Sequence, residues 1–428
     1  MRLELATHEV KDVRFGRRTR LRDGILEVDA AELAERVGGD PALDRVTIEL
    51  ARPGERVRIM HLLDTVEPRV RVMPPGSDFP GFLSPPVTTG HGRTHRLAGV
   101  AVMQSAVLPL SLGGLNVKEA LVDMAGPAAA LSPFAETLNV VLVCRVREGM
   151  TYAEYDAAIR RAGLRAAVYL ADAAAAAPPD RLERFELTPT DPALPRVAYI
   201  CLLMREGDVH SMFVYGRPVD ETPSLLHPNE FLDGAIVSGD HHIAATRNPT
   251  YVLQNHPVIR ELYRRHGESL TFAGVVVTKC LSSAFADKLR SASYAAKLAR
   301  LLGAQGVVIS AGTGGHAVAD LMLTCQQAEQ ARLKTALTCA EMGGDDGSEF
   351  GFVTFVPEAD AVVSTGNMDE LIELPEMERV IGGDTVIDIG NYEGGGGQPA
   401  LGRLRTAMRR VYCCSTLVGA GRMATRAL

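Results

Sequence analysis

The stretch Leu232-Asp-Gly-Ala-Ile-Val-Ser-Gly-Asp-His-His-Ile-Ala-Ala-Thr-Arg-Asn-Pro-Thr-Tyr251 lies near the middle of the chain and decides its fold class. Its apolar run Ala235–Val237 predicts a short buried strand. The polar run Ser238–His242 follows directly, and such strand exits are where α/β proteins place their chemistry. We therefore expect an α/β protein with a functional site at this point.

Asp240, His241 and His242 are the leading candidate catalytic residues. Three adjacent titratable side chains can serve as acid, base or metal ligands. Successive side chains point to opposite sides of an extended strand, but Gly239 permits a turn in which both imidazoles converge. Two roles stay open for the histidine pair: acid–base catalysis without metal, or ligation of a divalent metal such as zinc or iron.

A second polar cluster, Thr88–His95, follows the proline- and glycine-rich segment Met73–Pro86, which predicts a long loop. Arg93 could hold a carboxylate substrate through its planar guanidinium group. His91 and His95 could complete a metal site with the central histidine pair. In the alternative interpretation, the arginine and both histidines hydrogen-bond the loop to the core.

Segments along nearly the whole chain carry a resemblance to a known family: Ala51–Arg58, Gly92–His95, Asn139–Cys144, Asn255–Ile259 and Tyr263–Gly267. The sequence resembles the proprotein subunit of component B of the clostridial glycine, sarcosine and betaine reductases, and more distantly that of D-proline reductase. In that family the proprotein is cut at an Asn-Cys bond. The cysteine becomes a pyruvoyl group that captures the substrate amine as a Schiff base.

Counted back without a gap from Asn248-x-Thr-Tyr251, the family's Asn-Cys falls on Asp240-His241. Self-cleavage by acyl shift needs a thiol or hydroxyl that attacks the preceding carbonyl and is then eliminated, and an imidazole offers no such leaving group. We therefore expect an uncleaved chain without pyruvoyl. The resemblance also places Arg93 and His95 near the family's site.

These observations predict an enzyme of reductase ancestry that breaks or rearranges a C–N bond in a small amino acid or N-substituted glycine derivative. Its substrate would contact His91, Arg93, His95 and Asn248, because so many polar groups are costly to keep without a role. Two alternatives stay open. One is a non-catalytic assembly subunit beside a second reductase-type subunit, and the other is a reductase component that self-processes at another residue.

Charge and composition exclude several classes of partner. Lys plus Arg is 45 and Asp plus Glu is 52, so the formal charge of −7 gives no electrostatic footprint for nucleic acid or an anionic membrane. No apolar run reaches the roughly 18 residues needed to span a bilayer, and the first residues lack a signal-peptide core. We therefore expect a cytoplasmic homo- or hetero-oligomer. Its seven cysteines contain no C-x-x-C, which argues against a disulfide scaffold.

The predicted domain organisation has four regions. Residues 1–136 alternate with period two and predict a mostly antiparallel β domain with a long loop. Residues 137–255 and 256–390 alternate strands and helices at intervals of roughly 25 to 30 residues, which predicts parallel, Rossmann-like, doubly wound α/β layers. Residues 391–428 form a Gly-rich link and a tail, in which Arg403–Arg410 predicts a basic helix.

The segment Ala311–His316 lies between a predicted strand and a predicted helix N-terminus, which is a usual place for an anion. It lacks the full G-x-G-x-x-G pattern of a dinucleotide site. We interpret it as a tight turn.

Overall fold

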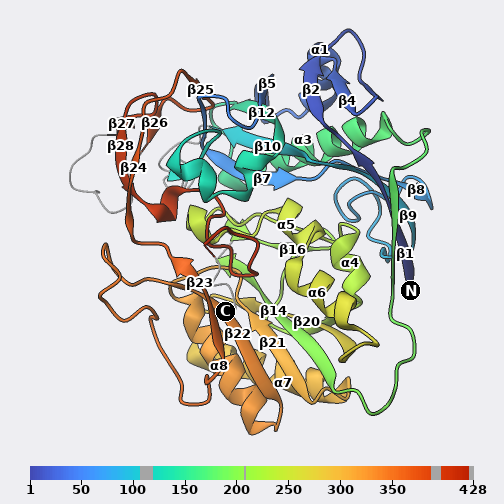
Figure 1. The fold of residues 1–428 in the computed structure, drawn as a ribbon, viewed down its shortest axis with the longest axis vertical. Helices are drawn as coiled ribbons and strands as arrows, with labels where there is room; N and C mark the ends of the chain where they lie inside the picture. The colour runs from blue at the N-terminus through green and yellow to red at the C-terminus, as the bar shows by residue number, and fades with distance from the viewer. Residues whose placement is uncertain (107–118, 207–208, 387–396, 424–428) are drawn as a thin grey trace.

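The computed structural model describes residues 1–106, 119–206, 209–386 and 397–423, and Figure 1 shows their arrangement. Mixed sheets with helices occupy both the N-terminal and the C-terminal part, so the expected α/β class is confirmed. Residues 391–396 of the predicted link lie outside the described residues. Within the described ranges, no helix combines the length and the apolar character that crossing a membrane would need.

Two four-stranded sheets form the N-terminal part, in the upper half of Figure 1. Antiparallel pairs predominate, as expected, but β1 runs parallel to β9 and β10 runs parallel to β12. One sheet has the order β13 (Arg181–Glu186), β1 (Arg2–Glu9), β9 (Gly92–Ala98), β8 (Arg69–Met73); the other has the order β5 (Leu43–Ala51), β12 (Leu138–Val146), β10 (Val100–Ala106), β7 (Leu62–Val66).

Helix α3 (Tyr152–Asp172) packs against these sheets and beside the shorter helix α1 (Ala30–Val37). It begins with a capping box, in which the Thr151 hydroxyl accepts from the Glu154 N–H and the Glu154 carboxylate accepts from the Thr151 N–H. Alanines on its inner face, such as Ala158, let the helix approach the strands closely. The cap therefore fixes where the first turn of α3 lies.

A seven-stranded sheet forms the C-terminal part, and five of its strands are parallel. Helices cover both of its faces, because alternate side chains of β14 pack on α7 and α8 or on α4, α5 and α6. The strands are β18 (Ser224–Leu226), β20 (Thr271–Cys280), β14 (Arg196–Glu206), β21 (Gly306–Ser310), β22 (Lys334–Glu341) and β23 (Val362–Asn367) in this order, with β15 (Val209–Ser211) paired to β14; the helices are α4 (Pro228–Leu232), α5 (Thr250–Gln254), α6 (Pro257–Arg265), α7 (Phe285–Leu301) and α8 (Ala317–Gln330).

Short strands complete the described structure. Their bounds are β2 (Asp12–Phe15), β3 (Arg20–Arg22), β4 (Ile25–Val28), β6 (Val57–Met60), β11 (Leu121–Asp123), β16 (Phe213–Val214), β17 (Arg217–Pro218), β19 (Ile236–Val237), β24 (Leu371–Leu374), β25 (Arg379–Ile381), β26 (Thr385–Val386), β27 (Gln398–Pro399) and β28 (Leu404–Ala407). They form small sheets, of which β2-β4-β3 is local and β11-β6-β25 joins distant parts of the chain.

The structure corrects two local predictions. Gly92–His95 belongs to strand β9 rather than to a loop, because β1 and β8 pair with it on either side. Arg403–Arg410 does not form a basic helix: β28 pairs with β24, and a single 3-10 turn follows at Met408–Arg410. In both cases the partner strand lies far away in the sequence.

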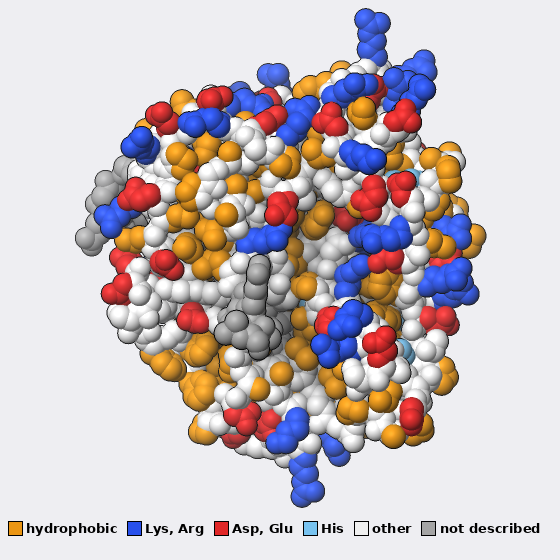
Figure 2. All heavy atoms as spheres, viewed as in Figure 1, with side chains coloured by type: hydrophobic (Ala, Val, Ile, Leu, Met, Phe, Trp, Pro, Cys, Tyr) orange, Lys and Arg blue, Asp and Glu red, His pale blue; other side chains and the backbone are white. Residues whose placement is uncertain are grey.

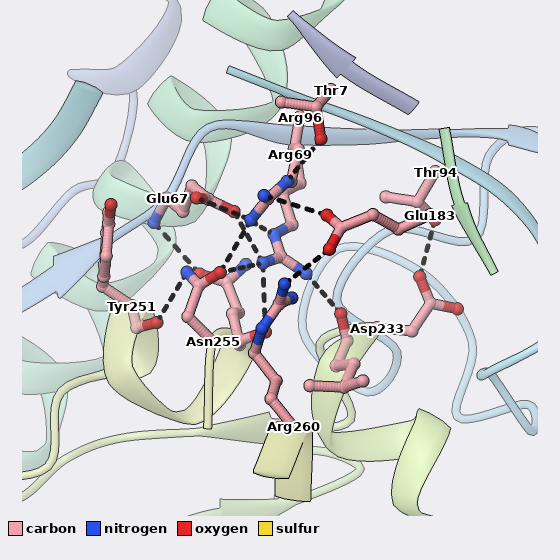
Figure 3. Close-up of polar contacts among 12 residues, drawn as sticks. Thr7, Glu67, Arg69, Thr94, Arg96, Glu183, Asp233, Tyr251, Asn255 and Arg260 are labelled. Carbon is pink, nitrogen blue, oxygen red and sulfur yellow. Dashed lines mark hydrogen bonds and ion pairs between the residues drawn. The ribbon is translucent and has the colours of Figure 1, made fainter. Parts of the chain in front are cut away.

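A charge network joins the N-terminal sheet to helix α6 (Figure 3); it is buried at Glu67, Arg69 and Arg96 and partly exposed at Glu183 and Arg260. Glu67 accepts from Arg69 (2.6 Å) and from Arg96 (3.4 Å). Glu183 accepts from Arg96 (3.2 Å) and from Arg260 of α6 (2.6 Å). Because all five groups are paired, burial of these charges is tolerated.

Candidate active site

The central loop, residues 238–249, connects β19 to α5. The buried carboxylate of Asp64 holds its end by accepting from the Thr250 N–H (2.8 Å) and hydroxyl (2.6 Å). The same Thr250 hydroxyl accepts from the Ser238 N–H (2.9 Å). Both ends of the loop are thus tied to one point.

The guanidinium group of Arg247 holds the middle of the loop. This fully buried side chain donates to the carbonyl oxygens of His241 (2.9 Å), His242 (2.9 Å) and Leu62 (2.6 Å). Hydrogen bonds from a charged donor are stronger than those between neutral groups. The backbone at both histidines is therefore fixed to strand β7.

His241 is buried and forms a pair with Asp156 in the first turn of α3. Its Nε2 lies 2.8 Å from Asp156 Oδ1, and the other carboxylate oxygen accepts from Arg160. Burial acts to raise the pKa of Asp156, but Arg160 and His241 outweigh it and lower that pKa below its usual range. Burial lowers the pKa of His241. At neutral pH the carboxylate is therefore charged and the imidazole is neutral, with Nε2–H donating and Nδ1 carrying the lone pair.

Gly239 allows the loop to lie close to α3. A Cβ at this position would overlap the Ser211 carbonyl oxygen and would lie 2.8 Å from the guanidinium group of Arg160. The glycine thus brings the neighbouring histidine within reach of its carboxylate partner.

Asp240 is also buried, but its surroundings raise the pKa of its carboxyl group, whereas those of Asp156 lower it. Its Oδ1 accepts from the His242 N–H (3.0 Å), whereas Oδ2 has no hydrogen-bond partner among the described residues. Burial raises the pKa of Asp240 to about 7, assisted by the charge of Asp64 and opposed by Arg247. The carboxyl group therefore titrates near neutral pH.

His242 and Asn248 lie at the carboxyl ends of the parallel strands. His242, with 27 % of its side chain exposed, places Nε2 3.8 Å from Glu206 Oε2 at the end of β14 and Nδ1 3.4 Å from Thr313 Oγ1 after β21. Asn248 Nδ2 donates to the Gly312 carbonyl oxygen (3.3 Å), and its buried Oδ1 has no hydrogen-bond partner within the described ranges. The turn predicted at Ala311–His316 therefore borders the site.

The second predicted cluster makes contacts with strand β1. Arg93 donates to Glu4 (2.7 Å and 3.0 Å), and His95 shares a hydrogen bond of 2.9 Å with His8, whose ring stacks on it. Burial lowers the pKa of both His8 and His95. His91 is exposed, just before β9. These contacts are of the kind that the alternative interpretation expects, in which the segment is hydrogen-bonded to the core.

In the part of the chain that the structure describes, no group of three or more His, Cys, Asp or Glu side chains is arranged to hold a metal ion. The four histidines proposed as ligands, 91, 95, 241 and 242, are therefore not gathered into a metal site in this conformation.

Sequence reasoning missed several residues of the site. Asp156 and Arg160 come from a helix that precedes the loop by many residues, with Asp156 85 positions before His241, while Glu206 and Thr313 come from two different strand ends. One rule could have pointed to Glu206 and Thr313: the carboxyl ends of parallel strands lie at the same edge of a sheet. Nothing in the sequence linked α3 to the histidines.

Comparison with known proteins identifies the family. The sequence model of the family of glycine/sarcosine/betaine reductase component B subunits matches residues 1–423. The chain is 36 % identical, over an alignment of 437 positions that covers all of both chains, to the glycine reductase complex component B subunits alpha and beta of Acetoanaerobium sticklandii. It is 37 % identical over 403 residues, 92 % of each chain, to the sarcosine reductase complex component B subunit alpha of Peptoclostridium acidaminophilum.

The betaine reductase complex component B subunit alpha of the latter organism is 33 % identical over 396 residues, which cover 89 % of this chain and 88 % of the relative. No solved structure matches the chain. The match to the family model covers almost every residue, and the relatives align over most of their own length. The chain belongs to the family of glycine, sarcosine and betaine reductase component B subunits.

Proposed function

We propose that the chain is an enzyme of the component B type that lacks the pyruvoyl group and acts on a small amino acid or N-substituted glycine derivative. The reaction would break or rearrange a C–N bond. The names of the relatives, which are glycine, sarcosine and betaine reductases, support this substrate class. The observation that carries the proposal is the buried His241–Asp156 pair at the position where the family resemblance places the cysteine.

The residues present do not fit a pyruvoyl group. Residue 241 is a histidine whose Nε2 is engaged by Asp156, and residue 240 is an aspartate with an unpartnered buried oxygen. Neither side chain has the sulfur or hydroxyl oxygen that an acyl shift followed by elimination requires. The proposed chemistry therefore uses proton transfer by the residues that are present.

Three residues have distinct proposed roles. His242 is partly exposed and burial lowers its pKa, so it is a neutral base that a substrate can reach. Asp240, with a pKa of about 7, can return a proton at neutral pH. His241 is oriented by Asp156, which fixes the position of its imidazole ring beside the other two groups of the loop.

Asn248 is the substrate-binding candidate with the most support, because its buried Oδ1 can accept from an N–H of a ligand. The roles of His91, Arg93 and His95 in substrate binding remain predictions.

The proposal includes the finer fold assignment, in which the parallel sheet is Rossmann-like and doubly wound. The strand order β20-β14-β21-β22-β23 and the helices on both faces support it. The next parallel strand after β14 in the chain, β20, lies on one side of β14. The parallel strand that follows, β21, and the strands after it lie on the other side. Ligands of such sheets bind where the strand order reverses, which is where His242 lies.

We also propose a cytoplasmic hetero-oligomer with a second reductase-type subunit, because the relatives are named as components of reductase complexes. A subunit that only assembles the complex would need no intact His241 or His242. Activity of the two histidine variants therefore separates catalysis from assembly.

Intact mass spectrometry under denaturing conditions tests the absence of self-processing. One chain near 45.9 kDa that does not react with phenylhydrazine is expected. Two fragments, one of them carrying a carbonyl-reactive end, would refute the proposal. Elemental analysis of the same sample tests for zinc or iron.

Turnover of glycine, sarcosine and betaine is then measured for His241→Ala and His242→Ala, with His266→Gln as a control. The control histidine directly follows α6 and precedes β20, and its ring hydrogen-bonds the Thr188 carbonyl oxygen and the Phe272 N–H. Both loop variants should lose activity by about a hundredfold or more, the usual contribution of an acid–base group. Full activity in both would end the proposal.

A further inference from the structure

The loop between β22 and β23 carries an exposed aromatic cluster. The side chains of Phe350, Val353 and Phe355 are 69 %, 56 % and 48 % exposed. The Phe350 ring makes edge contacts with Phe352 (5.9 Å between centroids) and Phe355 (6.5 Å). Figure 2 shows hydrophobic side chains gathered at the lower left, over the loop that Figure 1 draws there. Contiguous exposed apolar surface of this kind marks interaction sites.

A cavity of about 350 Å³ adjoins this cluster. Its lining combines the apolar side chains of Phe285, Met322, Leu323 and Val356 with the polar side chains of Ser283, Lys288, His316 and Thr354. Phe285, the first residue of α7, is itself 65 % exposed. The volume is at the small end of the range for ligand pockets. It suits one anchoring apolar side chain of a partner better than a large cofactor.

The loop is held in place before any partner binds. The Gly343 N–H donates to Asn367 Oδ1 (3.0 Å), and Asn367 Nδ2 donates to the Gly344 carbonyl oxygen (3.0 Å). The Met342 N–H donates to the Gly351 carbonyl oxygen (2.8 Å). A preformed surface loses little conformational entropy on binding.

The charges beside the aromatic cluster argue against pairing with a second copy of the chain. Asp345, Asp346 and Glu349 are exposed and directly precede Phe350. In a two-fold symmetric dimer the same patch would face itself, so these carboxylates would oppose their copies. Like charges across an interface are strongly unfavourable. The complementary surface is apolar at its centre and basic at its edge.

We propose that this surface, residues 343–356 together with Phe285, docks a different polypeptide that inserts an apolar side chain flanked by lysine or arginine residues. The loop follows the carboxyl end of β22, on the same sheet edge as the Thr313 turn that contacts His242. The proposal does not depend on the chemistry of the site.

Fluorescence anisotropy on the full chain tests it with two labelled peptides, a Leu-Phe anchor flanked by lysines and the same anchor flanked by glutamates. The lysine peptide should bind at least about tenfold more tightly. Phe285→Ser and Phe350→Ser should each raise its Kd by about tenfold, as for an interface hot spot. Phe15→Ser, at a 49 % exposed phenylalanine of β2, should leave the Kd unchanged.

The charge reversal Asp345→Lys with Asp346→Lys should shift the preference toward the glutamate peptide. Circular dichroism confirms that each variant is folded. Equal affinity for the two peptides would overturn the proposal, as would a Phe350→Ser variant that binds like Phe15→Ser. Light scattering that shows a dimer of the chain, lost in Phe350→Ser, would also overturn it, because the occupant would then be a second copy.

Discussion

Two carboxyl groups at the site, the partly exposed Asp156 and the buried Asp240, behave in opposite ways. Asp156 is paired with a guanidinium group and an imidazole, which keep it charged. Asp240 has one oxygen without a partner in the described structure, and burial pushes its pKa to about 7. Neighbouring titratable groups whose pKa values are driven apart are typical of acid–base sites. At the scale of single residues, this contrast is the strongest indication of chemistry.

The first prediction concerns the pH dependence of stability. Asp240 has a pKa of about 7 in the folded protein and of about 3.8 in an unfolded chain, so the folded state binds more protons between these values. The free energy of unfolding should therefore decrease as pH rises from about 4 to 7. Asp240→Asn should abolish this contribution, roughly 2 to 4 kcal/mol. Urea unfolding at pH 5 and pH 8 measures it.

The exposed Asp44→Asn provides the matched control for that titration. It should keep the pH dependence of the wild-type protein. If Asp240→Asn and the wild-type protein lose stability equally with pH, the raised pKa is wrong.

The second prediction concerns the His241 partner. Asp156→Asn removes the charge that orients the imidazole and leaves Arg160 without its carboxylate. The kcat should fall by about a hundredfold, and the pH profile of kcat should shift, because the amide can present either a donor or an acceptor to the ring. Asp172→Asn, at the exposed end of the same helix, should have neither effect. An unchanged pH profile would show that Asp156 is only structural.

Close contacts with α3 and with β15, whose last residue is Ser211, shape the central loop. The third prediction is that Gly239→Ala destabilises the protein by about 2 kcal/mol or more, because the added Cβ overlaps the Ser211 carbonyl oxygen. Gly39→Ala is the control, since nothing lies within 4 Å of a Cβ there. Urea unfolding of both variants measures the difference, and equal stabilities would contradict the described loop.

Local sequence patterns predicted most of the helices and parallel strands. The Thr151–Glu154 capping box marks the start of α3, and the apolar period marks α7 and α8. Strands β9 and β28 were missed because they depend on distant partners rather than on their own residues. The Asp156 partner of His241 was missed for the same reason: 85 residues separate them.

At the scale of the whole molecule, the network in Figure 3 connects the N-terminal sheet to helix α6 of the C-terminal part. The fourth prediction is that Glu67→Gln lowers the free energy of unfolding by about 3 to 5 kcal/mol, because Arg69 and Arg96 lose a buried counter-charge. Thermal unfolding measures it. Glu32→Gln, which breaks the exposed pair with Arg36, should change stability by less than about 1 kcal/mol. Similar losses in the two variants would contradict a coupling role.

The family resemblance described the whole molecule better than periodicity did. It spanned the chain, and the family model matches residues 1–423. Periodicity indicated a strand that begins at Leu138 but gave no signal for Arg181–Glu186, and it could not indicate that both segments pair with the N-terminal sheets. Whether a strand pairs with a distant sheet depends on packing between parts of the chain that are far apart in the sequence. A local sequence pattern does not contain that information.

The hydrogen bonds of the Arg247 guanidinium group determine how rigid the loop is when a ligand binds. One side chain tethers consecutive carbonyls to a neighbouring strand, so the loop has already lost its freedom during folding. An incoming molecule then finds the imidazoles at fixed positions and need not rearrange them. Ligands of different size should leave the backbone there superimposable, and selectivity should come from shape rather than from adaptation.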